Sequence, residues 1–220
     1  WADGAELERI VAARRTVGPT LIVTPKWRAA PVPIGTPEAK RGWVQLSGTD
    51  SPTWEGFLDD VGLGIAAMQS GQWLGGGITG TLPQPRSVQS GRGPRIVALV
   101  RARQDGRVLV GYLDDGDGYP ELDRLMPGSL AAASESAALF PVVQVFEPDL
   151  LDNYGMADLA NARLAERLVR AIGGGGNAVT FDLTLNGHVR SRTRLTLAFP
   201  PPFLAATLCL LIAALAIGWR

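Results

Sequence analysis

Apolar positions recur at helical spacing near the start of the chain. Leu7, Ile10 and Val11 fall on one side of a helix drawn over residues 4–15. Acidic residues come early in this segment and arginines late, as the helix dipole favours. The pattern predicts a helix over 4–15, and the continuous apolar run at 20–24 predicts a strand buried on both faces.

The clearest alternation of apolar and polar positions lies further along the chain. Residues 141–146 predict a strand, and the polar segment 147–155 predicts a loop at its carboxyl end. An apolar stripe predicts a helix over 156–172, and strict alternation predicts a strand over 179–185. A strand, a helix and a strand with short connections form a right-handed βαβ unit with parallel strands.

The middle of the chain has weaker signals. We expect a Pro- and Gly-rich loop at 28–42 and, because a Ser-Pro pair starts it, a short helix at 52–60. Two β-rich runs, 95–103 and 107–113, flank an Asp-Gly pair and predict a hairpin. The pattern as a whole predicts an α/β domain over 1–199, with a β-rich insertion at roughly 62–135.

The last part of the chain is uniformly apolar. Residues 203–219 carry no charge and have no polar helical face, and a helix of this length spans about 25 Å of a bilayer core that is about 30 Å thick. Trp219 and Arg220 then resemble an interfacial anchor. We expect residues 200–220 to form a transmembrane helix; the alternative is a buried core helix.

Composition narrows the classes of function. The chain has 21 basic and 21 acidic residues, and this balance argues against nucleic-acid binding, which needs surplus positive charge. A hydrophobic content of 46% argues against a disordered chain. The only cysteine, Cys209, lies in the apolar tail, so the domain before it has no disulfide, cysteine nucleophile or cysteine zinc site.

Several motifs resemble functional ones but fit them poorly. The glycine runs 75–77 and 173–176 lack the Lys-Ser/Thr of a P-loop, and the acidic segment 114–118 departs from EF-hand spacing. His188, the single histidine, follows an Asn-Gly turn, and the chain has no G-x-S-x-G nucleophile motif. We interpret these features as turns and a surface histidine, and we expect no metal and no cofactor.

A group of polar residues gives the most suggestive candidate site. Asp149, Asp152 and Asn153 follow a predicted strand and precede a predicted helix, where α/β folds place their ligands. Asp182 lies within the next predicted strand. The alternative is helix capping within an ordinary loop.

Five segments in order resemble a known family. They are TLIVTPKW at 20–27, PDLLDNYG at 148–155, Asn161-Ala162, FDLTLNG at 181–187 and PPFL at 201–204. This series resembles bacterial membrane proteins that carry domain of unknown function 4350. That domain is similar in fold to class I glutamine amidotransferases and to extracytoplasmic auxiliary subunits of gliding-motility-type ABC transporters.

The resemblance implies a flavodoxin-like parallel sheet held between two transmembrane helices, in the bacterial inner membrane and facing outside the cytoplasm. It also implies that the protein acts together with AAA-type ATPases and other membrane proteins. Glutamine amidotransferases need a nucleophilic cysteine, which this domain lacks, so the resemblance implies their fold without their activity. The candidate ligand- or partner-binding residues are Asp149, Asp152, Asn153, Asp182 and Asn186.

Three functional hypotheses follow from these observations. The first is a non-enzymatic, membrane-anchored domain that binds or scaffolds partner proteins in a membrane complex and binds no nucleic acid. The second is a carboxylate-dependent hydrolase that uses Asp152 and Asp182 as acid and base. The third is a structural spacer without a pocket beside residues 149–155.

Overall fold

The computed structural model describes residues 3–33, 35–38, 40, 43–126, 137–173 and 178–182, with 209, 212 and 216–218 of the tail. The chain divides into two compact units, Trp1–Ala178 and Val179–Arg220. The helices and strands given below all belong to the first unit, and they form its fold.

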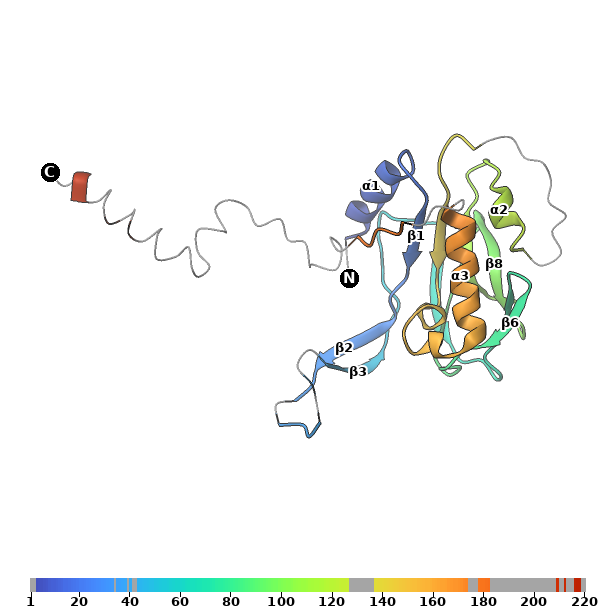
Figure 1. The fold of residues 1–220 in the computed structure, drawn as a ribbon, viewed down its shortest axis with the longest axis horizontal. Helices are drawn as coiled ribbons and strands as arrows, with labels where there is room; N and C mark the ends of the chain where they lie inside the picture. The colour runs from blue at the N-terminus through green and yellow to red at the C-terminus, as the bar shows by residue number, and fades with distance from the viewer. Residues whose placement is uncertain are drawn as a thin grey trace. The chain divides into compact units, whose positions relative to one another are not determined.

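A mixed sheet of eight strands forms the body of the first unit (Figure 1). The main path runs in the order β1-β10-β9-β8-β5-β6, while β7 pairs with β4 and β9, and the sheet curls into a half-barrel. Among the described strands of this sheet only β1 and β10 pair in parallel, and the other ladders are antiparallel. The strands are β1 (Thr20–Val23), β4 (Gly62–Ala66), β5 (Gln72–Gly75), β6 (Ile78–Thr81), β7 (Val88–Arg92), β8 (Ile96–Ala102), β9 (Val108–Leu113) and β10 (Val142–Val145).

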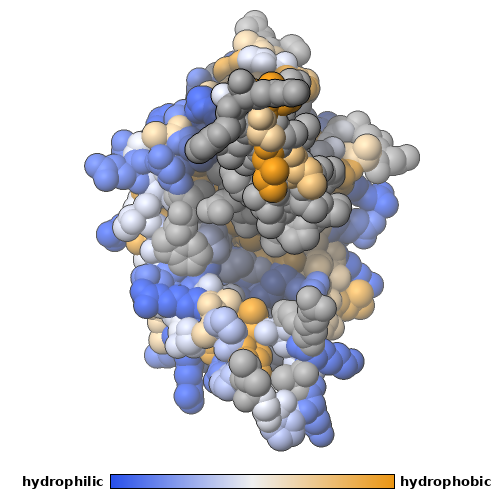
Figure 2. All heavy atoms as spheres, turned by 90° about the vertical axis from the view of Figure 1, so that its left-hand side faces the viewer, coloured by the Kyte–Doolittle hydropathy of each residue, from blue (hydrophilic) through white to orange (hydrophobic). Residues whose placement is uncertain are grey.

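Two further strands form a separate hairpin. Strands β2 (Trp27–Pro31) and β3 (Val44–Thr49) pair in antiparallel fashion and extend away from the sheet (Figure 1). Trp43, Val44 and Leu46 are each more than half exposed along this hairpin. In the lower part of Figure 2, where the hairpin lies, orange apolar residues sit among blue hydrophilic ones.

The helices begin and end for local reasons. Helix α1 (Gly4–Arg14) begins after Asp3, whose carboxylate accepts a hydrogen bond from the Ala5 amide at 3.1 Å. Helix α3 (Leu159–Gly173) buries one apolar stripe against the sheet and exposes its charged face. Short helices complete the unit: α2 (Pro120–Asp123) and the 3₁₀ turns η1 (Pro148–Leu150) and η2 (Gly155–Ala157).

The main core lies between the sheet and α3. Trp73 of β5, Leu99 of β8 and Leu109 of β9 are fully buried there, together with Leu164 and Leu168 from α3. Burying each such side chain contributes about 1.5–3 kcal/mol, so this layer supplies much of the driving force for folding. Through α3 the core also fixes the segment 147–158, which holds most of the predicted site.

Four local predictions are confirmed. The expected helix over 4–15 is α1, the expected strand over 141–146 is β10, and the expected helix over 156–172 is η2 followed by α3. The hairpin predicted around Asp-Gly is the antiparallel pair β8 and β9. Each of these elements has a strong signal within its own sequence.

The predicted fold class is wrong. A flavodoxin-like or glutamine amidotransferase-like parallel sheet was expected over 1–199, but the observed sheet is mostly antiparallel. The residues expected as an insertion at roughly 62–135 form most of this sheet, and β9 pairs with β10. Short turns between successive strands favour antiparallel pairing, so no helical crossover separates them.

Four local expectations are also wrong. Residues 52–60 form turns instead of a helix, and the expected loop at 28–42 begins with strand β2. Residues 179–182 of the expected strand over 179–185 are not in a strand, and 183–185 lie outside the described residues. Strand β1, expected to be buried on both faces, is only partly buried because it lies at the edge of the sheet.

The expected C-terminal transmembrane helix is not part of this fold as the structure describes it. Within the described residues, no helix is both long and apolar enough to cross a bilayer. The longest, α3, has 15 residues and several charged side chains. Of the predicted span at 203–219, the structure describes only 209, 212 and 216–218, and the rest of that prediction lies outside the described residues.

Candidate functional site

Asp149, the first predicted site residue, lies in the interior of the first unit. Its side chain is 1% exposed. One oxygen accepts a hydrogen bond from Lys26 Nζ at 2.9 Å, and the other accepts one from Trp27 Nε1 at 2.6 Å. The carboxylate is therefore fully engaged by residues that precede it by more than 120 positions in the chain.

Lys26 connects Asp149 to a second buried acid. Its ammonium group donates to Glu147 Oε1 at 2.5 Å and to the Ser87 carbonyl at 2.7 Å, so all three N–H donors have partners. Glu147 also accepts hydrogen bonds from the backbone amides of Gln89 and Asp149. We call Lys26, Glu147 and Asp149 the lysine cluster. Lys26 and Glu147 are both 0% exposed.

The lysine cluster holds the ends of two parallel strands together. Lys26 follows β1, and Glu147 follows β10 and caps the 3₁₀ turn η1. A buried charge without partners is very costly, so this network strongly specifies how the segment after β10 is placed. Because the cluster is covered on all sides, its evident role is structural, and it offers no free carboxylate at the surface.

The pKa of Glu147 reflects this burial. Removal from water raises it to about 7, opposed by attraction to Lys26 and assisted by repulsion from Asp149. Two buried carboxylates share one ammonium group, so the cluster keeps a proton on Glu147 to well above the pH at which an exposed glutamate releases it.

We expect stability to fall as pH rises from about 4.5 to about 7. In this range unfolded Glu147 has released its proton while folded Glu147 retains it, so the folded state binds more protons and raising the pH favours unfolding. A shift of this size corresponds to about 3 kcal/mol. Urea unfolding of the full chain at pH 5 and pH 8 should show this decline, and Glu147→Gln should lack it. Parallel pH profiles for the two proteins would contradict the assignment.

The other predicted site residues differ in how far the structure describes them. Asp152 is partly buried, and its pKa is raised, first by burial and also by the nearby charge of Asp149; its Oδ1 accepts from the Gly155 amide at 2.6 Å. Asn153 is exposed. Asp182 belongs to the second unit, and Asn186 lies outside the described residues. Their role as binding residues stays a prediction, as does the pairing of Asp152 with Asp182.

Asn161, part of the segment with the family resemblance, has a clear structural task. It is fully buried in α3, accepts a hydrogen bond from Trp73 Nε1 at 2.9 Å and donates to the Gly155 carbonyl at 2.9 Å. These bonds tie α3 to strand β5 and to the turn η2. The polar residues of this region thus stabilise the fold around the segment 148–161.

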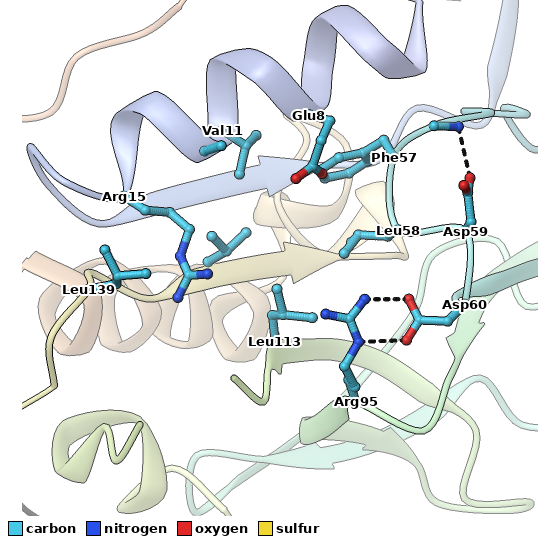
Figure 3. A pocket seen from close by; sticks show the side chains of 13 residues that line it. Glu8, Val11, Arg15, Phe57, Leu58, Asp59, Asp60, Arg95, Leu113 and Leu139 are labelled. Atoms are coloured by element: carbon cyan, nitrogen blue, oxygen red, sulfur yellow. Dashed lines mark hydrogen bonds and ion pairs between the residues drawn. The ribbon is translucent and has the colours of Figure 1, made fainter. Parts of the chain in front are cut away.

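A cavity of about 560 Å³ lies elsewhere, beside α1 (Figure 3). We call it the α1 cavity. Val11 on α1, Phe57 and Leu113 supply part of its apolar wall. Ligand pockets for small molecules have volumes of about 300–1,000 Å³, and the α1 cavity falls in this range, with apolar and charged residues sharing its walls. The lining residues are Glu8, Val11, Ala12, Arg15, Gly56, Phe57, Leu58, Asp59, Asp60, Arg95, Leu113, Leu139 and Val142.

Charged residues of both signs surround the α1 cavity. Arg95 donates two hydrogen bonds of 2.7 Å to Asp60, and this bidentate pair, together with attraction to Glu8, raises the pKa of Arg95 (Figure 3). Arg15 forms an ion pair with Asp115 and donates to the Phe140 carbonyl at 3.2 Å. Both arginines are therefore occupied.

Two carboxylates of the α1 cavity keep their charge available. Among the described residues neither Glu8 nor Asp59 has an ion-pair partner, although Asp59 accepts a hydrogen bond from the Gly56 amide at 2.8 Å. Glu8 projects from α1 toward the cavity (Figure 3). Both carboxylates are exposed, so they attract a positively charged group with the modest strength of surface charges.

The sequence interpretation missed Lys26, Glu147 and the α1 cavity. Lys26 is one of only two lysines in the chain, and it comes shortly after an apolar strand. This sequence context could have marked it as a buried lysine. Glu147 directly follows an apolar strand. The cavity had no such signal, because its walls come from segments that are distant in the sequence. Within the described residues, no cluster of three or more His, Cys, Asp or Glu is arranged to hold a metal ion.

Comparison of the chain with protein-family models finds no matching family, and searches against curated proteins and solved structures return no match. The resemblance to membrane proteins with domain of unknown function 4350 therefore stays a prediction. The parallel fold that this resemblance implied is wrong for the first unit.

Proposed function

We propose that the first unit is a binding domain, and that the α1 cavity takes a small ligand with an apolar body and a cationic group. The observation that carries this proposal is the combination of an apolar wall with two carboxylates, Glu8 and Asp59, that have no ion-pair partner among the described residues. The apolar body of the ligand would lie against Val11, Phe57 and Leu113.

Binding to this cavity needs no chemical step. The arginines of the cavity are already paired with Asp60 and Asp115, so they position the walls and leave the spare carboxylates to select charge. A hydrolase that uses Asp152 and Asp182 would need both residues at one pocket, and Asp152 does not line the α1 cavity. That reaction stays a separate prediction.

The test is a comparison of two probes of similar shape. Phenethylamine carries an ammonium group, while 2-phenylethanol has a neutral hydroxyl in its place. We expect the full chain to bind phenethylamine about threefold more tightly, a difference of about 0.7 kcal/mol, as for an ion pair at an exposed carboxylate. Titration followed by NMR chemical shifts would measure both affinities.

Glu8→Gln should remove most of this preference for the amine. Glu6→Gln is the matched control, because Glu6 lies on the same helix, is exposed and does not line the cavity. Equal affinity of wild type for the two probes, or an equal loss of amine binding in both variants, would show that the α1 cavity is not the site.

A further inference from the structure

A second cavity lies on the other side of the turns at 51–61. Its volume is about 320 Å³, and it shares Phe57, Leu58 and Asp59 with the α1 cavity. We call it the Gln144 cavity. The lining residues are Ser51, Pro52, Thr53, Trp54, Glu55, Phe57, Leu58, Asp59, Val61, Leu63 and Gln144.

Gln144 is the polar residue of an otherwise apolar strand. It lies in β10 between Val143 and Val145, and it is 3% exposed. Its Nε2 donates to Thr24 Oγ1 at 2.9 Å, but its Oε1 has no hydrogen-bond partner within the described structure. The Thr24 hydroxyl can accept or donate, so the Gln144 amide leaves one end unpaired in either orientation.

A second unpaired polar atom belongs to the same cavity wall. The indole Nε1 of Trp54 is buried and has no partner among the described residues. The Trp54 ring packs edge-on against Phe57, with centroids 5.8 Å apart and an interplanar angle of 69°. A buried polar atom without a partner costs free energy, and two of them in the wall of one cavity form an unusual combination.

We propose that the Gln144 cavity binds a small uncharged ligand that carries a carboxamide on an apolar body. The amide N–H of the ligand donates to Gln144, its carbonyl oxygen accepts from Trp54 Nε1, and its apolar part lies against Phe57, Val61 and Leu63. A carboxamide carries an N–H donor and a carbonyl acceptor on separate atoms of one rigid plane. It therefore satisfies both unpaired atoms at once.

Ligand entry requires a movement of the wall. Both unpaired atoms are buried, so a ligand reaches them only when part of the wall moves, and the partly exposed Trp54 belongs to that wall. Its fluorescence should therefore change on binding, and the change should be missing in Trp54→Phe. This site adjoins the α1 cavity through Phe57, Leu58 and Asp59, but the proposal does not depend on the function proposed there.

The test uses benzamide and acetophenone with the full chain. Acetophenone keeps the carbonyl acceptor but lacks the N–H donor, so wild type should bind benzamide about tenfold more tightly. Gln144→Met, which preserves length and removes the polar end, should weaken benzamide about tenfold and leave acetophenone unchanged. Trp54→Phe should weaken both probes, because the indole donor serves the carbonyl that they share.

Affinities would be measured by NMR titration after circular dichroism has shown that each variant is folded. Absence of saturable benzamide binding in wild type would overturn the proposal. Equal affinity for the two probes, or benzamide binding that neither variant weakens, would also overturn it. If Gln144→Met does not fold, the Trp54→Phe result decides alone. Glu8→Gln, the α1-cavity variant, should leave benzamide affinity unchanged, so the two sites are tested independently.

Discussion

Replacing Lys26 with methionine is expected to lower the free energy of unfolding by about 3–5 kcal/mol. Methionine keeps much of the length of lysine but removes the ammonium group that pairs with Glu147 and Asp149. The two carboxylates then face each other in the interior without a positive charge. Removing one partner of a buried ion pair is costly because the remaining charge has no water around it.

The chain has a natural control for this variant in its other lysine. Lys40 is exposed and lies over the Trp43 ring at 5.8 Å, so Lys40→Met should change stability by less than about 1 kcal/mol. Urea unfolding of both variants at pH 8 would give the comparison. At pH 5 the loss in Lys26→Met should shrink, because Glu147 is then protonated. A loss below about 1 kcal/mol at pH 8 would show that the lysine cluster does not hold the fold together.

Replacing Gly155 with alanine is expected to destabilise the protein by on the order of 4 kcal/mol. An added Cβ would lie 1.5 Å from the carbonyl oxygen of Asp149 and 3.2 Å from Asp152 Oδ1. The atom in the way belongs to the backbone, so no side-chain rotation relieves the overlap. The turn at η2 would have to move away from η1, and the hydrogen bond from Asn161 to the Gly155 carbonyl would be lost with it.

Gly173→Ala is the matched control for this substitution. Gly173 is the last residue of α3, and an added Cβ there meets no atom of the described residues within 4 Å. Alanine is the better helix former, so this variant should be neutral or slightly more stable. Thermal unfolding followed by circular dichroism would separate the two. A melting temperature of Gly155→Ala close to that of wild type would mean that η1 and η2 do not pack as closely as described.

Local signals in the sequence predicted local structure well. Helix α1 has its own N-cap and charge asymmetry, and α3 has an apolar stripe, so both could be recognised without knowledge of their neighbours. The order of strands in the sheet could not be recognised in this way. On the side away from β1, β10 could pair with a second parallel strand or with the antiparallel strand β9. The choice depends on pairing between distant segments, and both arrangements suit the apolar sequence of β10.

The candidate site, like the fold, could be predicted only where its signal is local. Asp149 was predicted from its place after a strand, and the structure places it in the buried lysine cluster. Its partners Lys26 and Trp27 lie far away in sequence, so no local pattern could show that the carboxylate faces inward. For the same reason the unpaired atoms of Gln144 and Trp54 became visible only once strands and turns were placed in space.

The parallel pairing of β1 with β10 has a consequence for synthesis of the chain on the ribosome. Thr20 pairs with Val142, and Lys26 bonds Asp149 across 123 positions in the sequence. At a rate of about 5–20 residues per second, β1 leaves the ribosome roughly 6–25 s before its partner strand is made. The antiparallel strands β4 to β9 can pair with one another during that interval. The N-terminal strand is thus expected to wait for β10 and to dock late, with Lys26 entering the interior only when both of its acids have arrived.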